Sequence, residues 1–231
     1  MDPTQITQPD IHVFGIRILE PVTSVTDIIV AIVCFYAYWQ LKTNLNTSKT
    51  ITFMKWYFLT MGLATFLGGM IGHGFLYAFN EHWKLVGWYI SMISIALIER
   101  SAIQYARPFI NPKLGSAFLV LNIVELIVLM AITTYTLHFS IVEFHCVYGL
   151  MVVVFSFHLY TYIKTRDRGS KWMLYAVGIL VVAAFVFNLP VVPHIWFNHR
   201  DLAHILMAIG SAMFLKAARN LEQVDRATLR V

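Results

Sequence analysis

Charged side chains are scarce in this chain: they make up 13 % of its 231 residues, whereas hydrophobic residues make up 58 %. Soluble globular domains carry about 25 % charged residues, so this composition excludes an ordinary soluble fold. Cysteine is scarce as well. Cys34 and Cys146 are the only two, too few for a disulfide framework, and we expect both to be small buried apolar residues.

Three other features are missing. The first 22 residues lack the basic and short apolar segments of a cleavable signal peptide. The chain has no repeat of fixed period and no low-complexity tract, and nothing marks an internal domain boundary. We therefore expect a single domain over residues 1–231.

Long apolar stretches fill almost all of the chain. The hydrocarbon core of a bilayer, ~30 Å thick, requires roughly 20 consecutive apolar residues in a helix. The sequence therefore predicts an all-α fold, a seven-transmembrane helix bundle in a multi-pass integral membrane protein of a cell or organelle membrane. The predicted spans lie near residues 23–41, 53–79, 85–106, 114–137, 141–164, 171–190 and 201–219.

Basic residues cluster in alternate connections between these spans. One side holds Lys42, Lys49, Lys55, Arg107, Lys113, Lys164, Arg166, Arg168, Lys171, Lys216, Arg219, Arg226 and Arg230, and the other side holds Arg17, Lys84 and Arg200. Basic loops stay in the cytoplasm, so the pattern predicts the N-terminus outside and the C-terminus in the cytoplasm. The net charge of +5 is then a topology signal and does not indicate nucleic-acid binding.

Histidines and one aspartate gather at the predicted outer side of the membrane. His73 lies late in the second span, Asp201 and His204 lie in the first turns of the seventh, and His199 precedes them. Ionisable groups are costly at membrane depth and mark functional sites there. Imidazole and carboxylate are zinc ligands, and a catalytic zinc takes three protein ligands and a water. The pattern predicts a zinc site of His73, His204 and either Asp201 or His199.

Simpler interpretations of the same residues remain open. His73 on its own could be a packing histidine hydrogen-bonded to a neighbouring helix. Asp201 could be the N-cap of the seventh span, since aspartate is a preferred capping residue, and capping does not exclude metal ligation. His199 could be a plain loop residue.

Two short motifs are similar to those of a known superfamily. The chain resembles the superfamily of alkaline ceramidases, adiponectin- and progestin-type receptors and related membrane hydrolases. The resemblance rests on the seven spans and on two segments, Gly69-Met70-Ile71-Gly72-His73 and the eight residues from His204 (His-Ile-Leu-Met-Ala-Ile-Gly-Ser). The resemblance implies a zinc-dependent amide hydrolase acting on lipids, with zinc bound by His73 and His204. This chain departs from the family pattern at position 69, which is glycine in place of serine.

The second departure lies in the seventh span, where Arg200 occupies the position of a family histidine. The third concerns a family aspartate, for which Glu81 is the nearest replacement. The predicted function is hydrolysis of a lipid-like amide or ester, with Glu81 or Asp201 moving the proton. The alternatives are a non-enzymatic receptor or sensor with a structural metal or a pH-responsive histidine cluster, and haem binding by His73 and His204.

Other ionisable residues fall inside the spans at different predicted depths. Glu99 and Arg100 lie toward the inner end of the third span, Glu125 lies near the middle of the fourth, and His145 lies near the outer surface. Adjacent residues on a helix point about 100° apart, so we expect Glu99 and Arg100 to have structural partners on neighbouring elements and not to pair with each other. Glu125 has no obvious cationic partner at its depth, so we expect it to be protonated, hydrogen-bonded or facing a water-filled cavity.

The charge pattern yields a topology prediction. A tag at the N-terminus should be accessible from the non-cytoplasmic side and a tag at Val231 from the cytoplasm, as measured by protease protection in intact vesicles. Accessibility of both tags from one face would rule out seven spans.

Overall fold

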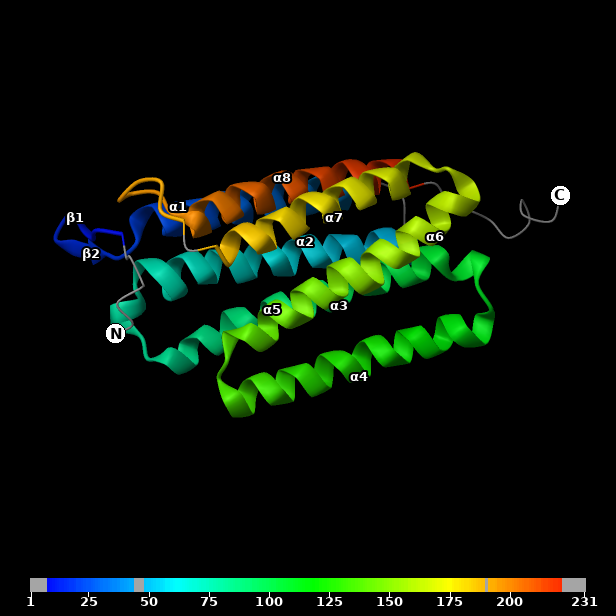
Figure 1. Cartoon of the computed structure of the whole chain (residues 1–231), viewed down its shortest axis with the longest axis horizontal. Helices are drawn as coiled ribbons and strands as arrows, with labels where there is room; N and C mark the ends of the chain where they lie inside the picture. Colours follow the sequence, from blue (N-terminus) through cyan, green and yellow to red (C-terminus); the bar gives the residue numbers. More distant parts are fainter. Residues whose placement is uncertain (1–7, 44–47, 190, 222–231) are drawn as a thin grey trace.

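The computed structural model describes residues 8–43, 48–189 and 191–221. Within these ranges long helices run antiparallel as seven rods (Figure 1). They are α1 (Pro21–Lys42), α2 (Lys49–Leu67) with the π-helical segment η1 (Gly68–Gly74), α3 (Lys84–Ala106), α4 (Pro112–Thr136), α5 (Phe139–Tyr148) with the π-helical segment η5 (Gly149–Val154) and α6 (Phe155–Thr165), α7 (Arg168–Phe187) and α8 (His199–Asn220). Three short 3-10 turns, Leu76–Ala78 (η2), Glu81–Trp83 (η3) and Arg107–Phe109 (η4), lie in the connections.

The all-α prediction is confirmed, and six of the rods are long and apolar enough to cross a membrane. These six are Pro21–Lys42, Lys84–Phe109, Pro112–Thr136, Phe139–Thr165, Arg168–Phe187 and His199–Asn220. The predicted span 53–79 is not among them. Lys49, Lys55 and four threonines interrupt the apolar character of α2, and its rod ends at Gly74 instead of continuing to Phe79.

Side-chain caps begin four of the helices. Ser48, Asn111, Asp167 and Asn198 each accept a hydrogen bond from a backbone N–H in the first turn of the helix that follows. These are residue types preferred at N-caps, because their oxygens satisfy otherwise unpaired helical donors. The turns between rods are therefore encoded locally.

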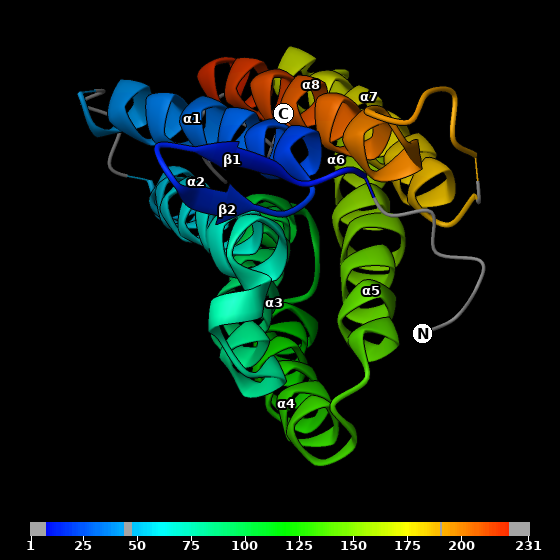
Figure 2. The same ribbon diagram turned by 90° about the vertical axis from the view of Figure 1, so that its left-hand side faces the viewer.

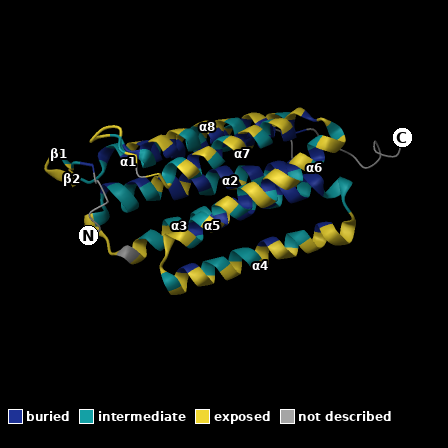
Figure 3. Ribbon diagram, viewed as in Figure 1, coloured by how far each residue is buried: buried dark blue, intermediate teal, exposed yellow. Residues whose placement is uncertain are grey.

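The rods do not all pack alike. Helices α1, α2, α3, α6, α7 and α8 contact one another in a closed ring, and α4 lies outside it against α3 and α5 (Figure 2). Most of α4 is exposed (Figure 3), and only 11 % of its most apolar stretch is buried. Its buried residues are Gly115, Asn122 and Thr133, so its apolar side chains face outward, as on a lipid-facing helix.

The apolar core lies inside the ring and draws on several helices. Phe58 and Met54 of α2, Ile98 of α3 and Phe214 of α8 are fully buried there. The rings of Tyr57 and Phe214 meet edge to face with centroids 5.8 Å apart. Cys34 and Cys146 are both free thiols, in agreement with the absence of a disulfide framework.

A small β-hairpin precedes α1, and the hydropathy pattern did not predict it. Strands β1 (Ile11–Val13) and β2 (Ile16–Ile18) pair antiparallel, with His12 opposite Arg17. Phe14 and Gly15 between them have φ of 51° and 78°, as in the two-residue turns of tight hairpins. The hairpin covers the end of the bundle where η1 finishes, since Leu19 N–H donates to Gly74 O at 2.9 Å.

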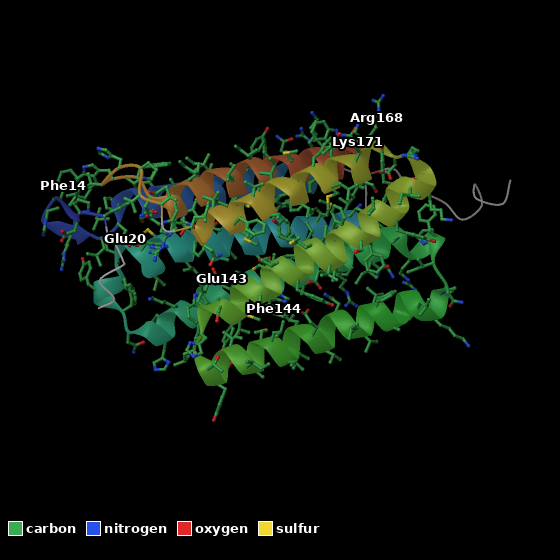
Figure 4. All side chains as sticks on the ribbon, viewed as in Figure 1. Phe14, Glu20, Glu143, Phe144, Arg168 and Lys171 are labelled. Atoms are coloured by element: carbon green, nitrogen blue, oxygen red, sulfur yellow. The ribbon has the colours of Figure 1, made fainter. Side chains whose placement is uncertain are left out.

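The two ends of the bundle differ in charge. The ends of α1, α3, α6 and α8 and the starts of α2, α4 and α7 share one end, which gathers most of the basic residues, and Arg168 and Lys171 lie there (Figure 4). Glu20 lies at the opposite end, beside the hairpin. Arg226 and Arg230 fall outside the described residues.

Close packing of α1 on η1 depends on glycine. A Cβ at Gly69 would lie 2.8 Å from the Ser24 carbonyl oxygen and 3.0 Å from Asp27 Cβ. At Gly72, three residues along the same segment, a Cβ would have no neighbour within 4 Å. The Ser24 hydroxyl donates to Gly69 O at 2.6 Å, which ties the two elements together.

The two glycines give a matched pair of variants. Gly69→Ala should lower the stability by about 1–3 kcal/mol, because a backbone oxygen cannot move away as a flexible side chain can. Gly72→Ala should leave it unchanged or raise it by about 0.5–1 kcal/mol through reduced backbone entropy of the unfolded chain. The measurement is thermal unfolding in detergent, and equal Tm values for the two variants would contradict this packing.

Candidate metal site

His73 of η1 and His204 of α8 lie on either side of Asp27 of α1. His204 Nε2 is 3.4 Å from Asp27 Oδ1, and His73 Nε2 is 3.8 Å from Asp27 Oδ2. The centroids of the two imidazole rings are 6.2 Å apart. Helices distant in the chain therefore bring two imidazoles to one carboxylate, and we call His73, His204, Asp27 and Glu20 the two-histidine cluster.

The other nitrogen of each ring is held by a further polar group. His73 Nδ1 lies 2.5 Å from Glu20 Oε2. His204 Nδ1 lies 3.0 Å from the Thr26 hydroxyl, and that hydroxyl is 3.0 Å from the Thr23 carbonyl oxygen. These contacts fix the orientation of both rings, so that each presents Nε2 to Asp27.

The cluster is buried to different degrees. Asp27 and His204 are buried, whereas the His73 side chain keeps 19 % of its surface exposed and that of Glu20 keeps 14 %. The site can thus be reached from the side of His73 and Glu20. Access of this kind is a requirement for any reaction at the cluster.

Glu20 links the cluster to the start of α8. Its Oε1 lies 3.3 Å from Arg200 Nη1. Burial acts to raise the pKa of Glu20, but the hydrogen bond with His73 and the charges of His73 and Arg200 outweigh it, so the pKa lies below its usual value. Glu20 is therefore a carboxylate at neutral pH.

Asp201 serves as the second member of a capping box. Its Oδ2 accepts from Asn198 N–H at 2.7 Å and from Gln8 Nε2 at 2.6 Å, while Asn198 caps the N–H of Asp201 in return. Its Oδ1 is buried without a hydrogen-bond partner. The N-cap of α8 is Asn198 and not Asp201 as predicted, and Asp201 at the third helical position completes the capping box. One of its oxygens remains free for another role.

His199 and Glu81 complete the predicted set. His199 is the first residue of α8, and its Nδ1 is buried without a hydrogen-bond partner. Glu81 begins the 3-10 turn η3, and its side chain lies outside the described part of the structure. Ligation by His199 and proton transfer by Glu81 therefore stay predictions.

Asp27 was not among the expected ligands. It is the only charged residue in the predicted span 23–41, and an isolated carboxylate at membrane depth is by itself a signal of function. That signal was present in the sequence. What the sequence did not contain was the position of Asp27 between His73 and His204, because their helices meet only in the folded bundle.

A second polar cluster lies between α3, α4 and α5. Glu99, Glu125 and His145 each offer one possible ligand atom, and these three atoms lie within 4.8 Å of one another. We call these residues the two-glutamate cluster. The expectation that Glu99 and His145 lie at different depths is wrong. The α5–η5–α6 rod runs obliquely across the bundle (Figure 1). A depth counted from residue numbers, as if every helix were perpendicular to the membrane, is therefore wrong for His145.

The partners of these residues lie on neighbouring helices. Glu125 Oε1 lies 2.7 Å from His145 Nδ1, so Glu125 does have a nitrogen partner. Asn122 donates to Glu99 Oε2 at 2.7 Å. Arg100 turns away from Glu99 toward α4, where it donates to Leu119 O at 3.1 Å.

The fold and these clusters define the class: an all-α protein whose helices are apolar enough to cross a membrane and enclose ionisable residues. The chain belongs to DUF6962, a family of unknown function, whose model matches residues 22–223. No curated protein and no solved structure matches it. The resemblance to the ceramidase and adiponectin-receptor superfamily therefore stays a prediction.

The cap at the start of α8 can be tested apart from any metal. Asp201→Asn should leave Tm nearly unchanged, since an amide oxygen still accepts from Asn198 N–H, whereas Asp201→Ala should cost about 0.5–2 kcal/mol. Thermal unfolding of both variants is the measurement. Equal losses in the two would mean that the charge of Asp201, and not its capping oxygen, is what the helix requires.

Proposed function

We propose that this protein is an integral membrane hydrolase that holds one zinc ion on His73, His204 and Asp27 and cleaves a lipid-like amide or ester. The observation that carries the proposal is the convergence of two imidazole Nε2 atoms on one buried carboxylate. Two imidazoles and a carboxylate, with the fourth position left to water, form a common catalytic zinc site.

The hydrogen bonds around the rings suit metal ligation. A metal-bound histidine donates its second ring N–H to a carboxylate, carbonyl or hydroxyl, which fixes the tautomer. Glu20 takes that position on His73 Nδ1. When Thr26 donates to Thr23 O, it accepts from His204 Nδ1–H, and the Nε2 lone pair of His204 then faces Asp27. A lone pair facing a carboxyl group is favourable when a metal cation or a proton lies between them.

Each residue then has a defined role. Asp27 supplies the third ligand, in place of Asp201 or His199, which the sequence predicted. The bound zinc would lower the pKa of its water and polarise the scissile carbonyl. Asp201 lies one turn before His204 on α8, and its unpartnered Oδ1 is available to take and return a proton.

The lipid character of the substrate follows from the setting of the site. The chain crosses the membrane seven times, with α2 and η1 as the least apolar crossing, the hairpin end outside and the basic end in the cytoplasm. Trp39, Trp56 and Trp172 lie at the basic end and Trp83, Trp88 and Trp196 toward the hairpin end, as expected for interfacial belts. The two-histidine cluster then lies near the outer interface, where an amide or ester bond of a lipid is found.

A receptor or sensor is the second candidate. The observation that favours it is that every ring nitrogen of His73 and His204 already has a polar neighbour. In that case the cluster holds α1, η1 and α8 together through a structural metal or through protonation of the histidines, and no substrate reacts there.

Zinc content separates these possibilities. His73→Ala, His204→Ala and Asp27→Asn should each lose one equivalent of zinc relative to wild type, since two remaining ligands hold the ion poorly. His194→Ala, in the exposed loop before α8, is the matched control and should lose none. The measurement is metal analysis by mass spectrometry on detergent-purified protein, with Tm as the check on folding.

Activity decides between enzyme and receptor. Wild type should hydrolyse a fluorogenic long-chain amide or ester in mixed micelles, and the three ligand variants should lose at least 100-fold in kcat/KM, the loss expected when a metal-activated water is removed. Zinc binding without turnover on either probe would favour the receptor. Unchanged zinc content in all three variants would overturn the ligand assignment itself.

A further inference from the structure

The two-glutamate cluster is far more buried than a structural ion pair requires. Glu99 has 1 % of its surface exposed and His145 has none. Glu99 Oε1 and Glu125 Oε2 are both buried without a hydrogen-bond partner. Two carboxylate oxygens are thus left unsatisfied in one place, and buried carboxylates without a compensating charge are costly when ionised.

No basic side chain among the described residues neutralises both carboxylates. Arg100, the residue next to Glu99, donates to Leu119 O and to Asn122 Oδ1 and lies over the Phe53 ring. His145 contacts one oxygen of Glu125 only. Glu99 Oε1 and Glu125 Oε2 therefore remain without a compensating donor.

The imidazole of His145 is oriented as a ligand would be. Its Nε2 lies 3.0 Å from the Met92 carbonyl oxygen, an acceptor only, so Nε2 carries the hydrogen. Nδ1 is then the atom that faces Glu125 Oε1 at 2.7 Å. A metal-bound histidine often donates its other ring N–H to a backbone carbonyl, which fixes the tautomer.

The chain makes room for the cluster by an irregular helix. The π-helical segment η5 starts at Gly149, where a Cβ would lie only 2.4 Å from Ile95 Cγ2 and would also overlap Glu99 Oε1. Any other residue here would displace the Glu99 carboxyl group. π-Helical segments occur frequently at functional sites, and this one borders the cluster.

A cavity gives access to the cluster. It has a volume of about 370 Å³ and lies between α4 and the α5–η5–α6 rod, with Glu99, Glu125 and Asn122 in its wall beside Tyr148, Ser156 and Tyr160. A cation could enter through it, and water could complete the coordination of that cation there.

We propose that Glu99, Glu125 and His145 form a second metal site, which binds one divalent transition-metal ion such as Zn²⁺ or Mn²⁺. Two carboxylates and one imidazole are the nitrogen and oxygen donors that such ions take in proteins. The ion neutralises both glutamates and satisfies their free oxygens. This site is separate from the two-histidine cluster, shares no residue with it and does not depend on its function.

Isosteric variants test the site. Glu99→Gln and Glu125→Gln keep the shape of the side chain and remove one anionic ligand each. Each should lose one equivalent of metal after loading with Zn²⁺ or Mn²⁺ and removal of excess, measured by mass spectrometry. Glu143→Gln is the matched control, since Glu143 lies on α5, the helix that carries His145 (Figure 4), but outside the cluster. This variant should bind as much metal as wild type.

Two outcomes would overturn the proposal. If Glu99→Gln and Glu125→Gln bind as much metal as wild type, the cluster holds protons and not an ion. If wild type binds no metal of either kind after loading, the site does not exist.

X-ray absorption of the wild type covers the case in which the glutamine variants fail to fold. Protein loaded with one equivalent of Mn²⁺, the more oxygen-preferring ion, should show one imidazole among oxygen ligands. If a second equivalent of Mn²⁺ still gave only two-imidazole coordination, all bound metal would lie on the two-histidine cluster, and this result would contradict the second site. One imidazole ligand, together with no zinc bound at His73 and His204, would support the second site and reject the proposed hydrolase. The two proposals can therefore fail separately.

Discussion

The close approach of α1 to the glycine-rich segment η1 is the constraint on which the two-histidine cluster depends. At Gly69 the two backbones are so near that a single added carbon would lie 2.8 Å from the Ser24 carbonyl oxygen. This proximity places Asp27 one turn further along α1 beside His73. Helices in apolar surroundings associate through such small-residue contacts, because lipid provides no hydrophobic force to drive them together.

Both polar clusters are built in the same way. Each lies against a π-helical segment that begins with glycine, η1 for one and η5 for the other. In each, a histidine is fixed by a second polar group, Glu20 for His73 and the Met92 carbonyl for His145. The histidines differ in their place along the rod, since His73 lies within η1 and His145 lies in α5, one turn before η5.

The departures from the superfamily pattern have a structural counterpart. Position 69 is glycine where the pattern has serine, and the Ser24 hydroxyl of α1 donates to the carbonyl of that glycine at 2.6 Å. Arg200 stands where the pattern has histidine, and it pairs with Glu20, which in turn contacts His73. Here α1 supplies Asp27 to the two-histidine cluster and Ser24 to the backbone of Gly69.

The sequence by itself determined the helical class, the approximate ends of the rods and the uneven charge of the two ends. These properties follow from the hydropathy of consecutive residues and from capping residues such as Asn111 and Asp167, which act within one turn of the chain. The tertiary structure alone decided that Asp27 lies between His73 and His204 and that Glu99, Glu125 and His145 meet. The physical reason is that contacts between helices depend on their crossing angles and on how closely their backbones approach, and a pattern read along one helix contains neither.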